Sequence, residues 1–572
     1  PGKKSAERNV CDICEQRRDD RARKWATGLG KTSLTIWTDE VADKNGRLAL
    51  LVGSFELTHW LSGNLVRTLA VRAPKDNHTS KDVSKNPSFA RLRRIWETTR
   101  NFWAEVAPIK DDCLNGRTLV ENVLSRDSIR NKRLVFKGRV NADLGPYHSY
   151  ELVIDGKGVP VLWDPERRAF ITTVNLEWLK KELLEKEEEE QKENLIIRLR
   201  KLNENVEVSI QTPGGYGEES RNIGSLTIEN IAEGITFMDG EYLPIVPILN
   251  EPSTFILLLS AEDAMSLVQE IRKKYEREMG KVRNRLPMHL SLIFAHKRTP
   301  LRALFDAGRQ ALARRGNASD WTVINVENNL IPDFLQNDPH FKTSKLIVLD
   351  RNGRKVTWRV PLTMGDGQTE DVWYPYVLMQ NTEQPKKKSL WFELTDDQWK
   401  NPWNEKHKYQ VYAGEVQQGE KVYFTPSTFD FEFLDVTSRR FEMYYDDDGQ
   451  RASIKRRPYL LDELDEWGQM VSHLNHLERH QVYQTVQMLE ATRELWGVGY
   501  PDSPEEETVF SQFVEDTLAN AAWPKSHQWM SISKEDRNLL VKAGVNGVLK
   551  DVVELYFQIL KTKFNAQPVK SS

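Results

Sequence analysis

Two cysteines in the printed sequence have a spacing that can bind metal. Cys11 and Cys14 are separated by two residues, a gap that lets both thiolates face one zinc ion. A tetrahedral site needs two more ligands, and the only other cysteine, Cys113, is distant in sequence. Two interpretations stay open: a zinc site completed from elsewhere, or two free thiols in a loop.

Two other motifs suggest chemistry less specifically. Gly28-Leu-Gly-Lys-Thr-Ser33 is close to a phosphate-binding loop, but that motif requires a glycine where Trp25 stands, and no apolar strand precedes it. His473, His476 and His480 are spaced to share one helix face and could in principle bind metal. No acid or cysteine is clearly beside them, so a surface that faces RNA or a partner protein is the better interpretation.

The elements that must position any site are clearest between Phe255 and Arg315. Phe255-Ile-Leu-Leu-Leu259 is an unbroken apolar run of the length of a buried strand, and apolar residues at helical spacing follow it. The pattern predicts, in order, a strand at 255–259, a helix from 260 to 279, a strand at 290–294 and a helix at 301–313. Strand, helix, strand and helix in this order form half of an α/β sandwich unit.

Three stretches of this region resemble a known family. They are Leu257-Leu-Leu-Ser-Ala-Glu-Asp-Ala-Met265, Arg283-Asn-Arg-Leu-Pro287 and Thr299-Pro-Leu-Arg-Ala-Leu-Phe-Asp-Ala-Gly-Arg309. They are similar to the palm of the large subunit of type III CRISPR RNA-guided complexes, and most similar to a subgroup with a degenerate palm. The resemblance is good over residues 225–315 and loose over most of the chain. It implies an α+β fold: a ferredoxin-like palm related to cyclases and polymerases, an inserted α/β region, a β-rich segment and a C-terminal helical bundle.

The resemblance also implies where a catalytic site would lie. Active members hold magnesium with two alternating aspartates after the first palm strand, which is predicted here at Arg47–Phe55 with a helix at 56–69 behind it. The matching positions are Ser54 and Glu56. Active members carry Gly-Gly-Asp-Asp in the hairpin turn before the strand at 255, and the turn here is Glu251-Pro-Ser-Thr254. A second register places that motif at Ser260–Asp263, although helical spacing follows there at once.

Both registers predict a palm without useful turnover. Phosphoryl transfer on a palm needs two metal ions held by carboxylates, and glycines that let the backbone approach the triphosphate. The glycines are missing, and Glu56, Glu251 and Asp263 remain only as vestigial candidates. The first hypothesis is therefore a scaffold with an inactive palm. The alternative is an active cyclic-oligoadenylate synthetase, a nucleotidyltransferase that binds magnesium and ATP through a divergent metal site.

Other features of the family lead to two further expectations. Its members carry a zinc ribbon of paired Cys-x-x-Cys elements just before this palm, so Cys11 and Cys14 would be half of such a ribbon. Its nuclease activity on single-stranded DNA uses a His-Asp pair, and no His-Asp dipeptide occurs in this chain.

Basic residues form two clusters that are candidates for RNA contact. In the first, arginines alternate with aromatic residues along a predicted helix at 88–106, which suits phosphate binding and base stacking but equally suits a half-buried structural helix. The second cluster lies around the predicted strand at 290–294. These residues either contact RNA or form a solvated rim of the palm. The candidates are Arg91, Arg93, Arg94, Arg100, Lys281, Arg283, Arg285, Lys297, Arg298 and Arg302. By resemblance, the partners would be guide RNA, target RNA, and the backbone, guide 5′-end and small helical subunits of the complex.

Length and composition set the outer bounds. A chain of 572 residues is longer than one core usually supports, and its formal charge of −3 gives no bulk attraction to nucleic acid. Few cysteines, and no apolar run near the roughly 18–20 residues that span a bilayer, favour the cytoplasm and no membrane. The predicted divisions are a basic segment with half a zinc ribbon (1–34), the first part of the palm (35–70), an inserted α/β domain (71–223), the remainder of the palm (224–343), a β-rich domain (344–457) and a C-terminal helical bundle (458–572).

Overall fold

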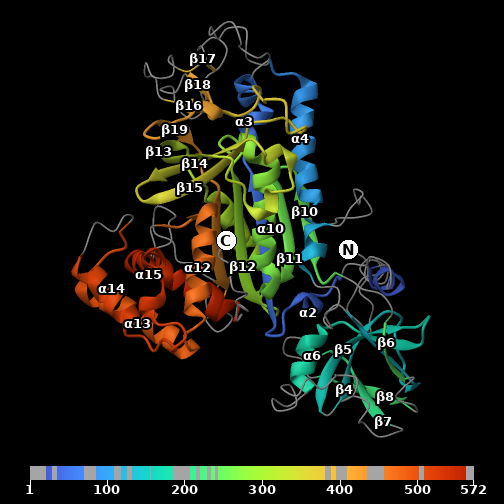
Figure 1. The fold of residues 1–572 in the computed structure, drawn as a ribbon. Coiled ribbons are helices and arrows are strands. Elements are labelled where there is room, and N and C mark those ends of the chain that lie inside the picture. Colours follow the sequence, from blue (N-terminus) through green and yellow to red (C-terminus); the bar gives the residue numbers. More distant parts are fainter. Residues whose placement is uncertain are drawn as a thin grey trace.

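In the residues that it describes, a computed structural model of the protein has three β-sheets and a C-terminal group of helices (Figure 1). It describes residues 21–28, 35–69, 86–107, 118–124, 132–154, 156–183, 206–213, 220–228, 234–238, 243–379, 388, 390–393, 409–434, 456–501 and 508–561. The predicted α+β class is therefore confirmed. Cys11, Cys14 and Cys113 lie outside the described residues, as does most of the first predicted division.

The central sheet is organised around β1 (Arg47–Phe55), an apolar strand that is buried along almost its whole length. Its strand order is β10-β11-β1-β12-β20-β21. Neighbouring strands run antiparallel except β12 and β20, which are parallel. The other strands are β10 (Val246–Glu251), β11 (Thr254–Ser260), β12 (Met288–His296), β20 (Thr428–Leu434) and β21 (Tyr459–Leu460).

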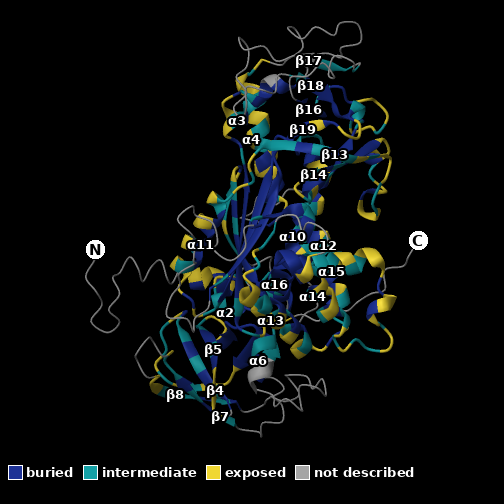
Figure 2. Ribbon diagram, turned by 90° about the vertical axis from the view of Figure 1, so that its left-hand side faces the viewer, coloured by how far each residue is buried: buried dark blue, intermediate teal, exposed yellow. Residues whose placement is uncertain are grey.

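Helices cover both faces of this sheet. Successive side chains of a strand point to opposite faces, so Ala49 and Leu50 of β1 enter different cores. The core on the side of Ala49 contains residues of α4 (Phe89–Ala104) and α10 (Ala261–Met279), and the core on the side of Leu50 contains residues of α11 (Leu301–Ala313). Burial on both sides explains the unbroken apolar runs, and Figure 2 shows these strands as the buried centre of the molecule.

The predicted helix at 56–69 is wrong as a single element. The segment instead forms α3 (Thr58–Leu61) and a 3-10 turn, η1 (Leu65–Thr68). Gly63 between them has a φ of 86°, a left-handed conformation that glycine adopts easily and that interrupts a right-handed helix. The other short elements near the sheet are α2 (Thr38–Val41), α5 (Leu119–Val123) and η4 (Gly280–Val282).

The second sheet has seven strands in the order β15-β14-β13-β19-β16-β18-β17. They are β13 (Ser319–Asn328), β14 (Ser344–Arg351), β15 (Arg354–Pro361), β16 (Tyr376–Met379), β17 (Trp391–Glu393), β18 (Tyr409–Tyr412) and β19 (Lys421–Phe424), with 3-10 turns η5 (Asp333–Leu335), η6 (Pro339–Phe341) and η8 (Ala413–Glu415) between them. β13 pairs with β14, so this sheet begins before the predicted boundary at residue 344. It also ends earlier than predicted, because β20 returns to the central sheet.

The third sheet has eight antiparallel strands in the order β3-β8-β7-β4-β5-β6-β2-β9 and lies apart from the second sheet (Figure 1). They are β2 (Leu134–Lys137), β3 (Arg139–Asn141), β4 (Ser149–Ile154), β5 (Lys157–Asp164), β6 (Ala169–Thr172), β7 (Val206–Gln211), β8 (Asn222–Ile228) and β9 (Ile235–Phe237). One helix, α6 (Leu176–Leu183), lies between β6 and β7 in the sequence. The inserted unit thus extends past the predicted boundary at residue 223. It does not include α4, which packs on the central sheet.

The C-terminal part is helical, as the sequence predicts. Its elements are η9 (Leu461–Glu463), α12 (Leu464–Leu474), α13 (Arg479–Trp496), α14 (Val509–Ala519), η10 (Trp529–Ser531), α15 (Lys534–Asn546), α16 (Val548–Val553) and a π-helical turn, η11 (Glu554–Ile559). Gly547 has a φ of 83° and separates α15 from α16. None of the helices in the described ranges is long and apolar enough to cross a membrane.

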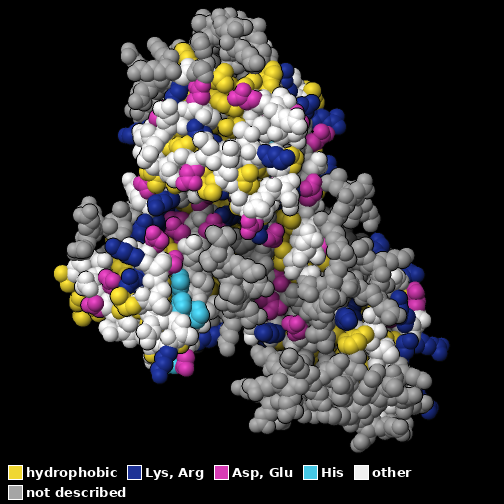
Figure 3. Space-filling view, viewed as in Figure 1, with side chains coloured by type: hydrophobic (Ala, Val, Ile, Leu, Met, Phe, Trp, Pro, Cys, Tyr) yellow, Lys and Arg dark blue, Asp and Glu magenta, His cyan; other side chains and the backbone are white. Residues whose placement is uncertain are grey.

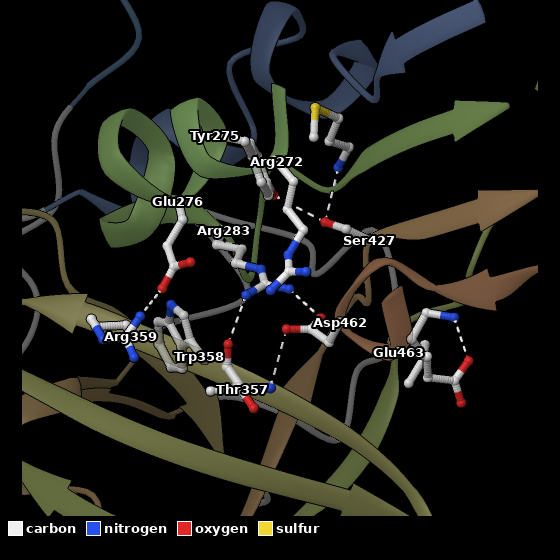
Figure 4. A network of polar contacts seen from close by, with 12 residues as sticks. Arg272, Tyr275, Glu276, Arg283, Thr357, Trp358, Arg359, Ser427, Asp462 and Glu463 are labelled. Atoms are coloured by element: carbon white, nitrogen blue, oxygen red, sulfur yellow. Dashed lines mark hydrogen bonds and ion pairs between the residues drawn. The ribbon is translucent and has the colours of Figure 1, made fainter. Parts of the chain in front are cut away.

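A buried polar network joins the central sheet, the second sheet and the C-terminal helices (Figure 4). Arg283, just after η4, forms an ion pair with Asp462 of η9 and donates to the carbonyl oxygen of Thr357 of β15 at 2.8 Å. The backbone N–H of Thr357 donates to Asp462 at 3.3 Å. A second ion pair joins Arg359 of β15 to Glu276 of α10. The three parts are therefore connected by charged side chains that are largely shielded from water.

Candidate functional site at one end of the central sheet

The end of β1 and the β10–β11 turn lie side by side, as the first register predicts. Ser54 of β1 is paired with Thr254 of β11, and the backbone N–H of Phe55 donates to the carbonyl oxygen of Ser253 at 3.1 Å. Ser54, Glu56 and the turn Glu251–Thr254 therefore share one end of the sheet. This is the place where a strand end and a hairpin turn could together hold a metal ion.

Glu56 is the carboxylate nearest the centre of this group, and it is already paired. One of its oxygens accepts the backbone N–H of Thr58 at 3.0 Å, and the other forms an ion pair with Arg315. Partial burial raises the pKa of Glu56, but the hydrogen bonds from Thr58 and the positive charge of Arg315 outweigh it and hold the pKa below its ordinary value. Glu56 is thus ionised and neutralised by an internal cation. Glu251, by contrast, is exposed at the turn.

The neighbouring positions carry neutral polar groups. Ser54 is buried, and its hydroxyl has no hydrogen-bond partner within the part of the chain that the structure describes. The residue opposite it on β12 is His289, whose Nδ1 lies 2.7 Å from the hydroxyl of Thr428 on β20. Burial, together with the charge of Arg315, lowers the pKa of His289 to about 3, so its imidazole is neutral.

The two predicted carboxylates at this end of the sheet are Glu56, which is already paired, and the exposed Glu251. Magnesium requires near-octahedral oxygen ligands, usually from more than one carboxylate. Within the described ranges, no group of three or more His, Cys, Asp or Glu side chains is placed to hold a metal ion. What the arrangement provides is one ion pair, one exposed carboxylate, a buried hydroxyl and a neutral imidazole.

The second register does not bring Asp263 to this site. Ser260 at the end of β11 pairs with Leu48 at the start of β1, so Asp263 in the first turn of α10 lies toward the opposite end of the sheet from Glu56. Asp263 is also largely buried. The structure thus separates Asp263 from the other two vestigial candidates because the whole length of β11 lies between them.

The arginines predicted on the first basic cluster lie on α4. Ser88 caps this helix by accepting the backbone N–H of Arg91. Phe89, Arg93, Trp96 and Arg100 are exposed and recur at intervals of four, three and four residues, which places them along one stripe of the helix. We call these four residues the α4 stripe. Arg100 lies over the ring of Trp96, 5.6 Å from its centroid, and Arg93 pairs with Glu97 at 2.8 Å.

Most of the second basic cluster is engaged within the protein. Arg283 belongs to the buried network, and Arg285 is 1% exposed and donates to Thr68 and to the carbonyl oxygen of Tyr374. Burial leaves neither guanidinium free to contact RNA, so the prediction that Arg283 and Arg285 bind RNA is wrong. Both side chains instead hold neighbouring segments of the protein together.

The remaining members of that cluster are at or near the surface. Lys281 pairs with Asp371 at 2.6 Å and Lys297 with Asp39 at 3.0 Å. Arg298 is exposed, and the side chain of Arg302 is 93% exposed with Asp306 3.7 Å away. Arg298 and Arg302 therefore stay available to a ligand, while the two lysines have partners in the protein.

Sequence reasoning missed Arg315 and His289 as members of the site. Arg315 follows α11 and reaches Glu56 across 259 positions of sequence, and nothing in its local sequence distinguishes it from the adjacent Arg314, which pairs instead with Asp430 at 2.9 Å. His289 directly precedes the predicted strand at 290–294. The available signal was the apolar strand around His289, which predicts a buried imidazole.

The predicted helix face shared by His473, His476 and His480 is wrong, because α12 ends at Leu474 and α13 begins at Arg479, but other side chains join two of these histidines. His473 Nδ1 lies 3.1 Å from Nε2 of His527, whose ring stacks on that of His476 with centroids 3.8 Å apart. Asp536 lies 3.4 Å from His473 Nε2, so the expectation that no acid lies beside these histidines is wrong. Histidine side chains gather on this face of the C-terminal helices (Figure 3). Within the described residues, these side chains do not form a group placed to hold a metal ion.

A comparison of the chain with known protein families, with curated proteins and with solved structures found no match.

Proposed function

We propose that this chain is the large scaffold subunit of a type III CRISPR ribonucleoprotein in antiviral defence, with an inactive nucleotide-cyclase palm. The connection β1–α4–β10–β11–α10–β12, with strands in the order β10-β11-β1-β12, supports a ferredoxin-like palm, because that motif has the order β-α-β-β-α-β. The same elements carry the sequence resemblance to the family. The proposal places the chain in the cytoplasm and keeps Cys11 and Cys14 as candidate zinc ligands.

The main support for an inactive palm is the ion pair between Arg315 and Glu56. In the proposed palm, Glu56 stands where one of two metal-binding carboxylates would be, and a guanidinium already neutralises it. Ser54 replaces the other carboxylate with a hydroxyl, which is a weaker ligand for magnesium. Pro252 fixes the backbone of a turn that has no glycine, so a triphosphate cannot approach the main chain closely.

The α4 stripe is the surface that best supports RNA binding. It alternates an aromatic ring with a guanidinium twice over twelve residues, a rise of about 16 Å along the helix. Aromatic rings can stack on unpaired bases while arginines hold phosphates, and this combination binds single strands without reading their sequence. In the proposed complex, guide–target pairing supplies the sequence specificity. The exposed Arg298 and Arg302 provide a second, purely electrostatic contact.

Purification of the chain from its native cells tests the scaffold proposal. We expect short guide RNAs and several partner proteins to co-purify in fixed ratio. A chain that elutes alone as a monomer without RNA would overturn the proposal.

A pair of double variants tests the RNA surface. Arg93→Ala with Arg100→Ala should weaken binding of a single-stranded RNA by about tenfold or more. It should also reduce the slope of log K against log salt by about 1.4, because each lost phosphate contact to a single strand contributes about 0.7. The control is Arg139→Ala with Arg309→Ala, which removes the same charge from exposed positions on β3 and α11. Equal effects of the two double variants would exclude the α4 stripe.

The remaining alternative is an active cyclic-oligoadenylate synthetase. The chain is incubated with ATP, magnesium or manganese, guide RNA and matched target RNA, and cyclic products are analysed by mass spectrometry. We expect none. Product that disappears in the Glu56→Ala variant would overturn the inactive palm and establish a divergent metal site.

A further inference from the structure

Three imidazoles and one carboxylate meet where the C-terminal helices join. His473 is in the last turn of α12, His476 lies between α12 and α13, His527 lies between α14 and η10, and Asp536 is in the first turn of α15. The ring of His527 stacks on that of His476 with centroids 3.8 Å apart, and its Nε2 is 3.1 Å from Nδ1 of His473. We call these four residues the histidine cluster.

The hydrogen bond between His473 and His527 requires its two nitrogens to share one proton. An imidazole nitrogen that carries a hydrogen can only donate, so one of the two must be the donor and the other the acceptor. The other nitrogen of His473, Nε2, lies 3.4 Å from Asp536, which stabilises one positive charge on His473. The cluster thus accommodates one imidazolium. Protonation of both rings would leave two donors and two positive charges facing each other.

The surroundings of His527 oppose a second positive charge. Burial, with the charges of His476 and His473, lowers the pKa of His527 below its ordinary value of 6.5. The negative charge of Asp536 lies on the far side of His473, where Ser533 donates to it at 2.7 Å. Because the pKa of His527 is lowered in the folded chain, the attached form is favoured above pH 6.5 and loses stability as the pH falls below it.

His527 attaches the connection between α14 and α15, residues 520–533, to the end of α12. Within this connection, the backbone N–H of His527 donates to the carbonyl oxygen of Pro524, which is a local bond. Trp529 is buried in the same core as α12, whereas Trp523 is half-buried, with its ring 6.0 Å from that of His527. A segment held by local bonds and few buried side chains can open without unfolding of the helices around it.

We propose that the histidine cluster is an acid-sensitive switch: protonation of both His473 and His527 releases the connection 520–533 from α12 and uncovers Trp523. Histidine is the side chain whose charge ordinarily changes between about pH 5 and pH 8, so a modest acidification is sufficient to operate such a switch. The switch does not depend on the proposed scaffold role, because neither RNA nor a partner protein takes part in it.

Hydrogen–deuterium exchange of the full-length chain, measured by mass spectrometry between about pH 7.5 and pH 5.5, tests this switch. Exchange times are scaled to the intrinsic exchange rate at each pH. Peptides from α10 report any global loss of stability on acidification. The loss of protection in peptides from 520–533 should exceed theirs by about fivefold or more, a factor that corresponds to the repulsion between two unit charges in contact even in bulk water.

Two variants should abolish or reduce this excess loss. His527→Phe keeps a flat ring beside His476 and Trp523 but cannot bind a proton, so protection of 520–533 should follow that of α10 at every pH. His473→Gln offers His527 both a donor and an acceptor, so the hydrogen bond can form in either protonation state of His527. His480→Phe is the matched control: it removes an exposed imidazole outside the cluster and should respond like the wild-type chain.

Equal losses of protection in 520–533 and α10 of the wild-type chain would overturn the switch, since the opening would then be global. An excess loss of wild-type size in both His527→Phe and His473→Gln would also overturn it, because the proton would then act elsewhere. The two variants remove different halves of the same hydrogen bond, so the test does not depend on either one alone.

Discussion

At the scale of single residues, the ion pair of Arg315 with Glu56 decides what the end of the central sheet can bind. A guanidinium and a divalent cation compete for the same carboxylate, so removing one should favour the other. We expect Ser54→Asp with Arg315→Ala to gain Mn²⁺ binding in isothermal titration calorimetry, because two carboxylates then face the turn without an internal cation. Ser54→Asn with Arg315→Ala is the control with one carboxylate fewer. Mn²⁺ binding by the wild-type chain that is lost in Glu56→Gln would contradict this account.

The buried imidazole of His289 should make the stability of the fold depend on pH. The pKa of His289 is about 3 in the folded chain and ordinarily 6.5, so between these values the unfolded chain binds a proton that the folded chain does not. Stability is therefore lost as the pH falls below 6.5, by about 1 kcal/mol between pH 7 and pH 5.5. His289→Gln should reduce that pH dependence in urea unfolding followed by circular dichroism. His480→Gln removes an exposed imidazole as a control. An unchanged pH dependence in His289→Gln would refute the assignment.

At the scale of elements, the contact between β1 and α4 depends on a glycine. A methyl group on Gly53 would lie 2.6 Å from the indole of Trp103, which is itself fully buried and stacked on Phe255. Gly53→Ala should therefore lower the free energy of unfolding by about 1–3 kcal/mol, because a tightly packed core cannot accommodate the extra volume.

Gly468→Ala is the matched substitution in the interior of α12, where an added methyl meets no atom within 4 Å. It should raise the free energy of unfolding by about 0.5–1 kcal/mol, since alanine restricts the unfolded chain. Urea unfolding of both variants measures the difference. Equal effects would show that α4 does not pack closely on β1.

How much the sequence could predict also differs between elements. The apolar run of β11 and the helical spacing of α10 identify those elements because the signal lies within a few consecutive residues. The pairing of β12 with β20 could not be predicted, because a parallel pair joined across the entire second sheet leaves no local pattern. Ser54, Glu56 and the turn Glu251–Thr254 lie together as the first register predicts, whereas Arg315 was missed because its position beside Glu56 depends only on tertiary contact.

At the scale of the whole molecule, the buried network holds three parts together. The side chain of Asp462 is 8% exposed and pairs with Arg283, whereas Asp465 is 65% exposed and pairs with Arg272. Asp462→Asn should cost about 3–5 kcal/mol because it leaves a buried guanidinium without its counter-ion. Asp465→Asn should cost about 0–1 kcal/mol, as exposed pairs do.

Calorimetry should also show the melting of Asp462→Asn separate into more than one transition. A single transition with equal losses in the two variants would contradict a coupling role for the network.

The parallel pair of β12 with β20 has a consequence for how the chain is made. The second sheet is inserted between two strands that end up as neighbours, so the central sheet gains its β20 edge only after that sheet has been synthesised. At about 5–20 residues per second on the ribosome, about 7–26 seconds separate the emergence of β12 from that of β20. During this interval β12 presents an open edge to the cell, and the nascent chain depends on chaperones, or on early closure of the second sheet, to avoid pairing with the wrong strand.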